Sequence, residues 1–322
     1  MRVGAIDIGS NSVRLLVAEV ADPAAPAGAL VTLARAGEVC RLARGLDRNR
    51  AIDAGLAERA GDLAAEFLRR ARALGAAHVV IGATAALRSA SNGAQVAEII
   101  GRRTGLAVRI LSGDEEAQLV YRSVVVGLGP GARRSPCVVF DIGGGSVEVV
   151  SGLGEEAGRW VSLPLGAVSL TERHLTSDPP TPAELEALRE EVRNRLMHNC
   201  AYMPGRTPLL AGVGGTVSVL ASLDLGLDVY NPALIEGWLI TPPRLNELVA
   251  LLARSSHDER LSRSVVGEGR ADIVVAGALV VAELATRFPA PGLLCSTQGL
   301  RYGLARLAAE EALDAGPDAR QA

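Results

Sequence analysis

Two stretches of the sequence place an aspartate directly before a short turn rich in glycine and serine. FDIGGGSVEVV occupies residues 140–150, and AIDIGSNSVRLLV occupies residues 5–17. Three consecutive glycines cost backbone entropy, so such a turn is expected where a ligand approaches the main chain closely. Backbone N–H groups that converge in a turn bind anions, and the carboxylate at the strand end lies where open α/β sheets bind their ligands. These residue types therefore favour the binding of phosphate groups.

The two stretches are copies of one motif, because they align at an interval of 134 positions. Asp7 then matches Asp141, and Ser12 matches Ser146. In each copy an apolar run precedes and follows the turn, which predicts strand–turn–strand, unlike the strand–turn–helix of dinucleotide-binding proteins. One copy opens each half of the chain, so the sequence predicts two domains of related topology.

A third glycine-rich turn, GVGGT at 212–216, follows an apolar run and precedes a helical pattern. The N-terminus of a helix in this position is a ready anion site, because its first N–H groups have no partner within the helix. Together the three turns supply the candidate phosphate-binding residues: Ser10, Asn11, Ser12, Gly143, Gly144, Gly145, Ser146, Gly214, Gly215 and Thr216.

Strand and helix patterns mix along the whole chain. Apolar periodicity predicts helices over 53–74, 92–104, 181–198, 243–254, 270–287 and 299–313. Strands are predicted over 3–8, 13–20, 30–33, 78–83, 108–111, 137–141, 147–151, 209–213 and 293–295, and residues 37–46 are predicted to be mostly loop. Ser112 is expected to cap a further helix, with Glu115 closing a capping box, and the tail from Gly316 is expected to be disordered. This mixture predicts α/β layers.

Composition excludes several classes of protein. The chain has 322 residues, which suggests two domains, and its net charge of −3 offers no basic field for nucleic acid. All 33 basic residues apart from histidine are arginine. Without lysine the chain cannot form a P-loop, a pyridoxal Schiff base or a protein-kinase site.

The spacing of cysteine and histidine and the hydropathy of the chain indicate the cellular compartment that we expect. The four cysteines and four histidines show no zinc-binding spacing, so free thiols in a reducing compartment are expected. No apolar run reaches the roughly 18 residues that a membrane helix needs, and no signal-peptide pattern opens the chain. We therefore expect a cytoplasmic protein with no membrane partner. A homodimer is expected, although the sequence leaves the oligomeric state open.

At these motifs the sequence resembles the exopolyphosphatase/guanosine pentaphosphate phosphohydrolase (Ppx/GppA) family of the actin-like ATPase superfamily. The matching segments, in chain order, are DIGSNSVRLLV (7–17), ATAALR (83–88), ILSGDEEAQL (110–119), FDIGGGSVE (140–148), LPLGAVSLTE (163–172) and GVGGT (212–216). RADIVVAGAL (270–279) and GLRYGLA (299–305) extend the match more weakly, and Tyr302 stands where the family often has Glu.

The resemblance implies an α/β fold of two actin-like (ribonuclease H-like) domains with the active site in a cleft between them. Domain I is expected over residues 1–128 and domain II over 129–298, and the last helix, about 299–315, is expected to pack back on domain I. The chain looks like a short form, because the C-terminal domains of longer members are missing.

The resemblance also implies removal of terminal phosphate from inorganic polyphosphate with Mg²⁺ or Mn²⁺. The second Glu of the SGxEEA motif, here Glu116, is the family's catalytic base. Asp141 and Glu148 resemble the carboxylates on the metal side of the site, with Glu148 also counted as catalytic, and Asp7 mirrors Asp141 from the other domain. Arg88, at the end of ATAALR, could bind a phosphate through two hydrogen bonds.

Three other functions stay open at this point. Conversion of guanosine pentaphosphate to the tetraphosphate uses the same phosphate machinery, and the sequence shows no guanosine pocket that would decide. An actin-like sugar kinase would need a catalytic Asp facing a sugar hydroxyl, and the SGDEEA segment argues against it. A non-catalytic nucleotide or polyphosphate sensor is disfavoured because Glu116 and Glu148 are both present.

Overall fold

The computed structural model describes residues 1–21, 30–204 and 208–314, so the predicted disorder from Gly316 lies outside the described residues. The chain forms two compact units. Unit 1 consists of Met1–Ser123 and the segment from Leu300, and unit 2 consists of Val124–Gly299.

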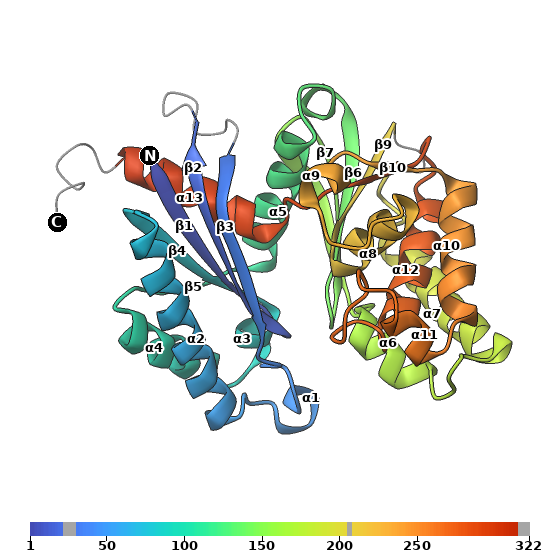
Figure 1. Ribbon diagram of the computed structural model, residues 1–322, viewed down its shortest axis with the longest axis horizontal. Coiled ribbons are helices and arrows are strands. Elements are labelled where there is room, and N and C mark those ends of the chain that lie inside the picture. Colours follow the sequence, from blue (N-terminus) through green and yellow to red (C-terminus); the bar gives the residue numbers. More distant parts are fainter. Residues whose placement is uncertain (22–29, 205–207, 315–322) are drawn as a thin grey trace. The chain divides into compact units, whose positions relative to one another are not determined.

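Unit 1 is built on a mixed sheet with the strand order β3-β2-β1-β4-β5 (Figure 1). The strands are β1 (Arg2–Ile8), β2 (Ser12–Val20), β3 (Leu30–Val39), β4 (His78–Ala83) and β5 (Val108–Ile110). β1, β2 and β3 form an antiparallel meander, and β4 and β5 run parallel to β1. The predicted strand–turn–strand at the start of the chain is therefore the β1–β2 hairpin.

Helices cover both faces of this sheet. They are α1 (Leu46–Asn49), α2 (Ala54–Ala73), α3 (Ala85–Ser89), α4 (Gly93–Thr104), the start of α5 (Gly113–Gly127), and α13 (Leu300–Asp314). A Cβ at Gly4 would contact Ala71 of α2, whereas a Cβ at Gly82 would contact Leu304 of α13. Gly4 pairs with Val79, three residues before Gly82, and neighbouring strand residues alternate between faces. Helices α2 and α13 therefore lie on opposite faces, and the chain's last helix completes the first unit.

Tyr302, the departure from the family pattern, fastens α13 to β3 within unit 1. Its hydroxyl lies 2.7 Å from Thr32 Oγ1 and accepts a hydrogen bond from Arg35. The Arg35 guanidinium also lies 5.2 Å from the centre of the Tyr302 ring, in a cation–π contact. A tyrosine therefore fits this position because β3 supplies both a hydroxyl and an arginine.

Unit 2 repeats the topology of unit 1. Its strand order is β10-β11-β9-β6-β7-β8, with β6 (Pro136–Ile142), β7 (Val147–Leu153), β8 (Glu156–Leu163), β9 (Leu209–Gly214), β10 (Leu239–Ile240) and β11 (Leu293–Cys295). β6, β7 and β8 form the meander, and β9 and β11 follow as parallel strands. The antiparallel meander with two parallel strands added occurs in both units, as the internal repeat predicts.

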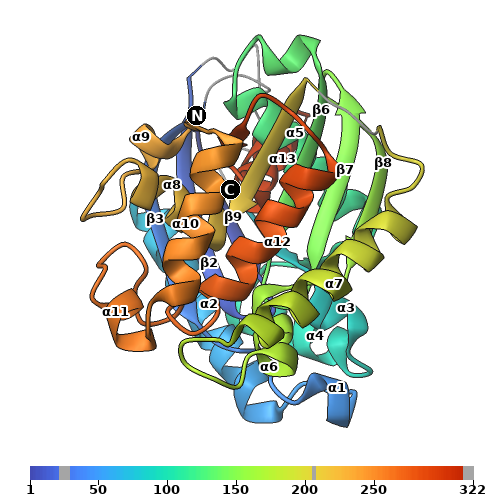
Figure 2. The same ribbon diagram turned by 90° about the vertical axis from the view of Figure 1, so that its right-hand side faces the viewer.

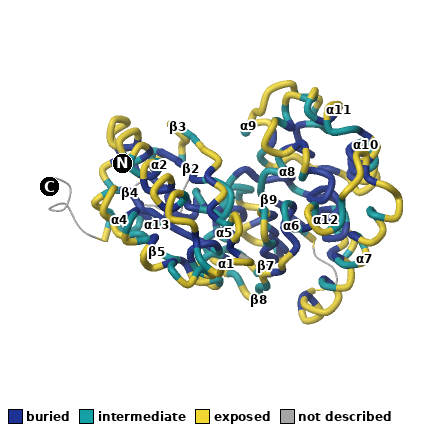
Figure 3. Tube along the Cα trace, turned by 90° about the horizontal axis from the view of Figure 1, so that it is seen from below, coloured by how far each residue is buried: buried dark blue, intermediate teal, exposed yellow. Residues whose placement is uncertain are grey.

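The helices of unit 2 include a central one, α12, which several of the others contact (Figure 2). They are α6 (Ala167–His174), α7 (Pro182–Asn199), α8 (Gly215–Asp224), α9 (Pro232–Ile235), α10 (Pro242–Arg254), α11 (His257–Leu261) and α12 (Val274–Arg287), with a 3₁₀ turn at Ala132–Arg134. α12 packs against α6, α7, α8 and α10 and is buried over most of its length (Figure 3). A helix that is apolar on every side belongs in the core, which explains the VVAGALVVAELA run.

The predicted elements are present, two of them with different bounds, and the structure adds short elements that the sequence pattern does not predict: β8, β10, α1, α3, α6, α9 and α11. β3 continues to Val39, through part of the predicted loop 37–46, because Val39 pairs with Ser12 at the end of the meander. α12 begins at Val274, four residues after the predicted start. β8 and α6 were not predicted: β8 carries Gly158 and exposed charged residues rather than a clean alternation of apolar side chains, and α6 has only eight residues.

The close approach of α13 to α5 gives a stability test. A Cβ at Gly303 would lie 2.6 Å from the Leu119 carbonyl oxygen. Gly303→Ala should therefore lower the free energy of unfolding by about 1–3 kcal/mol, the usual cost of overpacking a tight contact. Urea titration of purified protein measures this value.

Gly101→Ala in α4 is the matched control. The nearest atom to its Cβ would be the Leu106 carbonyl oxygen at 3.4 Å, an ordinary contact. Here the gain in helix propensity, up to about 1 kcal/mol, should leave stability equal or higher. Equal losses in both variants would show that the α5–α13 contact is looser than described.

Candidate active site

The β6–β7 hairpin of unit 2 presents the glycine-rich turn 143–146. The Gly143 N–H donates to the Ser146 carbonyl oxygen at 2.9 Å, which closes the turn. Asp141 and Glu148 lie directly opposite each other on the two strands. Because opposite residues of an antiparallel pair share a face, both carboxylates project to the same side of the sheet beside the turn.

The β1–β2 hairpin of unit 1 has the same geometry with different side chains. The Gly9 N–H donates to the Ser12 carbonyl oxygen at 3.0 Å, and Asp7 lies opposite Arg14. Arg14 Nε donates to Ser12 Oγ at 2.9 Å, so the hydroxyl accepts there and its proton is directed elsewhere. The two hairpins thus differ in charge: an Asp–Arg pair in unit 1 and an Asp–Glu pair in unit 2.

Asp7 lies at the protein interior, with 7% of its surface exposed. Burial raises the pKa of its carboxyl above the ordinary value because the charged form is disfavoured away from water, although Arg14 and Arg301 act in the opposite direction. Both arginines belong to unit 1, so within that unit Asp7 lies in a cationic setting.

The carboxylate pair of unit 2 fits a divalent cation. Glu148 is 7% exposed and accepts a hydrogen bond from Ser162 Oγ at 2.8 Å, which fixes the orientation of its carboxylate. Mg²⁺ is commonly held by one or two carboxylates, with water and substrate phosphates completing its octahedron. Among the described residues no group of three or more acidic, histidine or cysteine side chains forms a ready metal cage. The pair Asp141 and Glu148 thus suits a metal shared with a phosphate ligand.

The third turn links β9 directly to α8. Gly214 has φ +112°, a backbone conformation that residues with a Cβ rarely adopt. A Cβ at this position would also lie 2.6 Å from the Ile142 carbonyl oxygen and 3.2 Å from Asp141 Oδ1. The third turn therefore lies against the end of β6, beside the carboxylate pair.

The two residues after Gly214 have different surroundings. The Arg270 guanidinium covers Gly215: a Cβ there would lie 2.6 Å from Arg270 Nε. Thr216 is buried, and its side chain packs against Gly277 of α12. The backbone at the start of α8 thus remains suited to an anion, whereas the Thr216 hydroxyl is directed into the fold.

The two glutamates at the start of α5 have separate positions. The Ser112 N–H donates to Glu115 Oε2 at 2.8 Å, and the Glu115 N–H lies 3.2 Å from Ser112 Oγ. This reciprocal pair confirms the predicted capping box. The hydrogen bond from the Ser112 backbone is the main reason that the pKa of Glu115 is lowered.

Glu116 is instead held by Arg88. Arg88 Nη1 lies 2.9 Å from Glu116 Oε2, and the Glu116 side chain is only 13% exposed. The same Nη1 donates to the Leu111 carbonyl oxygen at 2.8 Å, which ties α3 to the residue just before the cap. The structure thus brings together two predicted site residues that are 28 positions apart in the sequence.

Sequence reasoning did not include three residues that the structure places at these turns: Arg270, Ser162 and Gly166. Arg270 opens the RADIVVAGAL segment, and that match was the available signal. Ser162 lies on β8, a strand that was not predicted, so no signal identified it. Gly166 lies in the LPLGAVSLTE segment, where the family match carried no assigned role.

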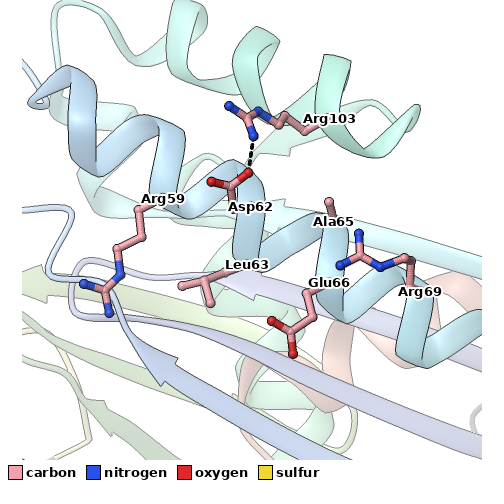
Figure 4. Close-up of a pocket in the computed structure, with 7 residues that line it drawn as sticks. All are labelled: Arg59, Asp62, Leu63, Ala65, Glu66, Arg69 and Arg103. Carbon is pink, nitrogen blue, oxygen red and sulfur yellow. Dashed lines mark hydrogen bonds and ion pairs between the residues drawn. The ribbon is translucent and has the colours of Figure 1, made fainter.

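A surface pocket of about 530 Å³ lies elsewhere in unit 1, between α2 and α4 (Figure 4). Its lining residues are Arg59, Asp62, Leu63, Ala65, Glu66, Arg69 and Arg103. Arg103 forms ion pairs with Asp62 and Glu58, so opposite charges on the two helices compensate each other. The lining includes none of the predicted site residues.

Among the described residues, none of the helices has both the length and the apolar character that a membrane crossing requires.

Comparisons with known proteins identify relatives of this chain. The model of the Ppx/GppA phosphatase family matches residues 17–309. The chain is 34% identical over 292 residues to Exopolyphosphatase 2 of Mycobacterium tuberculosis, covering 88% of this chain and 90% of that protein. It is 29% identical to the guanosine-5'-triphosphate,3'-diphosphate pyrophosphatase of Vibrio vulnificus, covering 94% of this chain and 58% of that protein.

The fold agrees as well. The crystal structure of the Aquifex aeolicus Ppx/GppA family member superposes with a TM-score of 0.84 at 28% identity, covering 98% of this chain and 99% of that one. This match confirms the predicted actin-like α/β class. With its duplicated hairpins, its SGDEEA cap and a family match over most of its length, the chain belongs to the Ppx/GppA phosphatase family.

Proposed function

We propose that this protein is an exopolyphosphatase that releases terminal phosphate from inorganic polyphosphate by attack of water. The observation that carries the proposal is the arrangement at the start of α5. Glu115 is used by the helix cap, whereas Glu116 is paired with Arg88 and mostly shielded from solvent. A carboxylate held in one orientation is what a general base requires.

The proposed role of Glu116 is to orient the attacking water and accept its proton. Arg88 holds the carboxylate through Nη1, and its other N–H groups remain suited to a phosphate oxygen. Phosphoryl transfer needs little covalent chemistry from the protein, so positioning and neutralisation of charge account for most of the rate.

Binding of the phosphate chain is assigned to the turns described above. Backbone N–H groups of Gly143, Gly144, Gly145, Ser146, Gly214, Gly215 and Thr216 serve unit 2, and Ser10, Asn11 and Ser12 serve unit 1. Arg270 joins this set because its guanidinium lies over the start of α8. The Thr216 hydroxyl is left out, since it packs against Gly277.

Asp141 and Glu148 are the proposed ligands of a divalent cation, Mg²⁺ or Mn²⁺. When bound, the cation neutralises charge on the phosphoryl oxygens as the anhydride bond breaks. Ser162 keeps the Glu148 carboxylate in place for this role. Asp7 is proposed as an auxiliary residue, because it pairs with arginine rather than with a second carboxylate.

Guanosine pentaphosphate is the second candidate substrate. The similarity to the Vibrio vulnificus enzyme favours it, although this chain covers only 58% of that protein. Both candidate substrates present a terminal phosphoanhydride to the same groups. A cytoplasmic location and a homodimeric assembly are further proposals that rest on the sequence alone.

The test is phosphate release by purified protein from polyphosphates of several lengths and from guanosine pentaphosphate, with and without Mg²⁺. We expect turnover of polyphosphate, with a higher kcat/KM than for the nucleotide. A higher kcat/KM for guanosine pentaphosphate would assign the second function. Release from neither substrate would overturn the proposal.

A further inference from the structure

The carbonyl groups of the glycine-rich turn in unit 2 are held from one side by the first turn of α6. The Ala167 N–H donates to the Gly143 carbonyl oxygen at 3.0 Å. The N–H groups of Val168 and Ser169 both donate to the Gly144 carbonyl oxygen, at 2.9 and 3.2 Å. The N–H groups at the start of a helix commonly donate to a ligand or to a side-chain cap. Here they donate to the carbonyl groups of the turn instead.

The direction of these carbonyls fixes the direction of the neighbouring N–H groups. In a trans peptide the C=O of one residue and the N–H of the next point to opposite sides. Because the carbonyls of Gly143 and Gly144 point at α6, the N–H groups of Gly144 and Gly145 point away from it. Within the described part of the chain neither of these N–H groups donates to a protein oxygen. The turn is thus held with two donors directed outward, as an anion site requires.

The close approach of α6 depends on Gly166, its N-terminal cap residue. A Cβ at this position would lie 2.3 Å from Gly144 C, Gly144 O and Gly145 C. Such distances cannot be accommodated without movement of the turn or of the helix. Gly166 is therefore the position at which a single methyl group would separate α6 from the turn.

Unit 1 has a similar but not identical arrangement, built from unrelated residues. The Asn11 carbonyl accepts from the N–H groups of Cys40 and Arg41, both at 2.9 Å, and the Ser10 carbonyl accepts from Ala43 at 3.0 Å. By the same peptide geometry the Asn11 N–H points away from this segment. The segment 40–43 is a loop rather than a helix. Of the held carbonyl groups, only Ser10 and Gly144 occupy matching positions of the two hairpins. Two unlike segments thus hold the two turns, and at this matching position the carbonyl is held in both units.

We propose that Gly166 and the first turn of α6 are positioning elements of the phosphate site: they hold the glycine-rich turn with the Gly144 and Gly145 N–H groups directed toward the phosphate oxygens of the substrate. This inference rests on the proposed function, since it assigns the anion at the turn as a phosphate chain. The inference adds a physical reason for the binding orientation of the turn: α6 holds the turn in that orientation before substrate arrives.

The test compares three variants in a Glu116→Gln background, in which hydrolysis is slow enough to measure binding. Gly166→Ala introduces the methyl group. Ala167→Pro removes the N–H that donates to the Gly143 carbonyl oxygen. Position 167 is the first of the helix, which tolerates proline, and the preceding Gly166 has the extended backbone (ψ 150°) that a residue before proline favours. Gly131→Ala is the matched control, because its Cβ would meet nothing within 4 Å. Binding of long-chain polyphosphate is measured by calorimetry.

We expect Gly166→Ala and Ala167→Pro to weaken polyphosphate binding by about 10- to 100-fold, the range for losing one or two hydrogen bonds to a charged group. In the parent protein, hydrogen exchange should be fast at Gly144 and Gly145 and slow at Val168. Polyphosphate should slow exchange at the two glycines, and Gly166→Ala should speed it at Val168. The control should match the parent in both measurements.

Two outcomes separate failure of this inference from failure of the proposed function. If Gly166→Ala melts near the parent and binds polyphosphate equally well, the positioning role is overturned. If the parent does not bind polyphosphate, the proposed function fails, and exchange at Gly144, Gly145 and Val168 without ligand still decides whether α6 holds the turn. If the variants melt at a much lower temperature, hydrogen exchange at Gly144, Gly145 and Val168 in the folded parent still decides whether α6 holds the turn.

Discussion

Glu116→Gln should lower kcat for polyphosphate by about 10²–10⁴-fold, the usual contribution of a general base. This loss corresponds to roughly 3–5 kcal/mol of activation free energy. Glutamine keeps the size and polarity of the side chain but cannot accept a proton from water. Affinity for polyphosphate should be kept or improved, because one negative charge leaves a site that binds an anion.

Glu115→Gln is the natural control, one residue away. Glutamine can also close a capping box with Ser112, so both activity and stability should stay near the parent values. The melting temperature of Glu116→Gln should also change little, because glutamine keeps an oxygen that can accept from Arg88, and 29% of the Arg88 side chain is accessible to water.

Turnover numbers, melting temperatures and affinities of both variants, measured side by side, decide between the assignments. If Glu115→Gln is inactive and Glu116→Gln is not, the two roles are exchanged. If both variants remain active, the base lies elsewhere in the chain.

Asp141→Asn should lower activity by about 10²–10³-fold at moderate Mg²⁺, the order expected when a group that stabilises transition-state charge is lost. The physical reason is the pairing of Asp141 with Glu148 across β6 and β7, which directs two carboxylates to one side of the sheet. Removing one charge should weaken the hold on the cation, so higher Mg²⁺ should restore part of the activity. Excess chelator should abolish the activity of the parent.

Cation binding can be measured without turnover, by titrating Mn²⁺ into the purified protein and following its electron paramagnetic resonance. Asp141→Asn and Glu148→Gln should both weaken Mn²⁺ binding in the presence of a phosphate ligand. Asp7→Asn should change it less, because Asp7 pairs with Arg14. Full activity of the parent in excess chelator, or unchanged Mn²⁺ binding in both unit 2 variants, would remove the cation from the mechanism.

The sequence by itself determined the local features of the site. The two hairpin turns and the capping box of α5 depend on residues no more than four positions apart. Short-range hydrogen bonds and glycine conformations fix such features, so residue types in order are sufficient to predict them. The internal repeat likewise predicted two units of one topology, since equal hairpins begin equal meanders.

Only the tertiary structure decided which residues far apart in the sequence come into contact at the hairpin turns and at the start of α5. Arg88 reaches Glu116 across 28 positions, α6 reaches the glycine-rich turn from beyond β7 and β8, and Arg270 covers Gly215 from the segment before α12. These contacts depend on how helices pack against the sheets, and apolar periodicity specifies which face is buried but not which neighbour it meets. The orientation of a carbonyl group or a guanidinium is therefore absent from the sequence pattern, because it is set by packing among elements far apart in the chain.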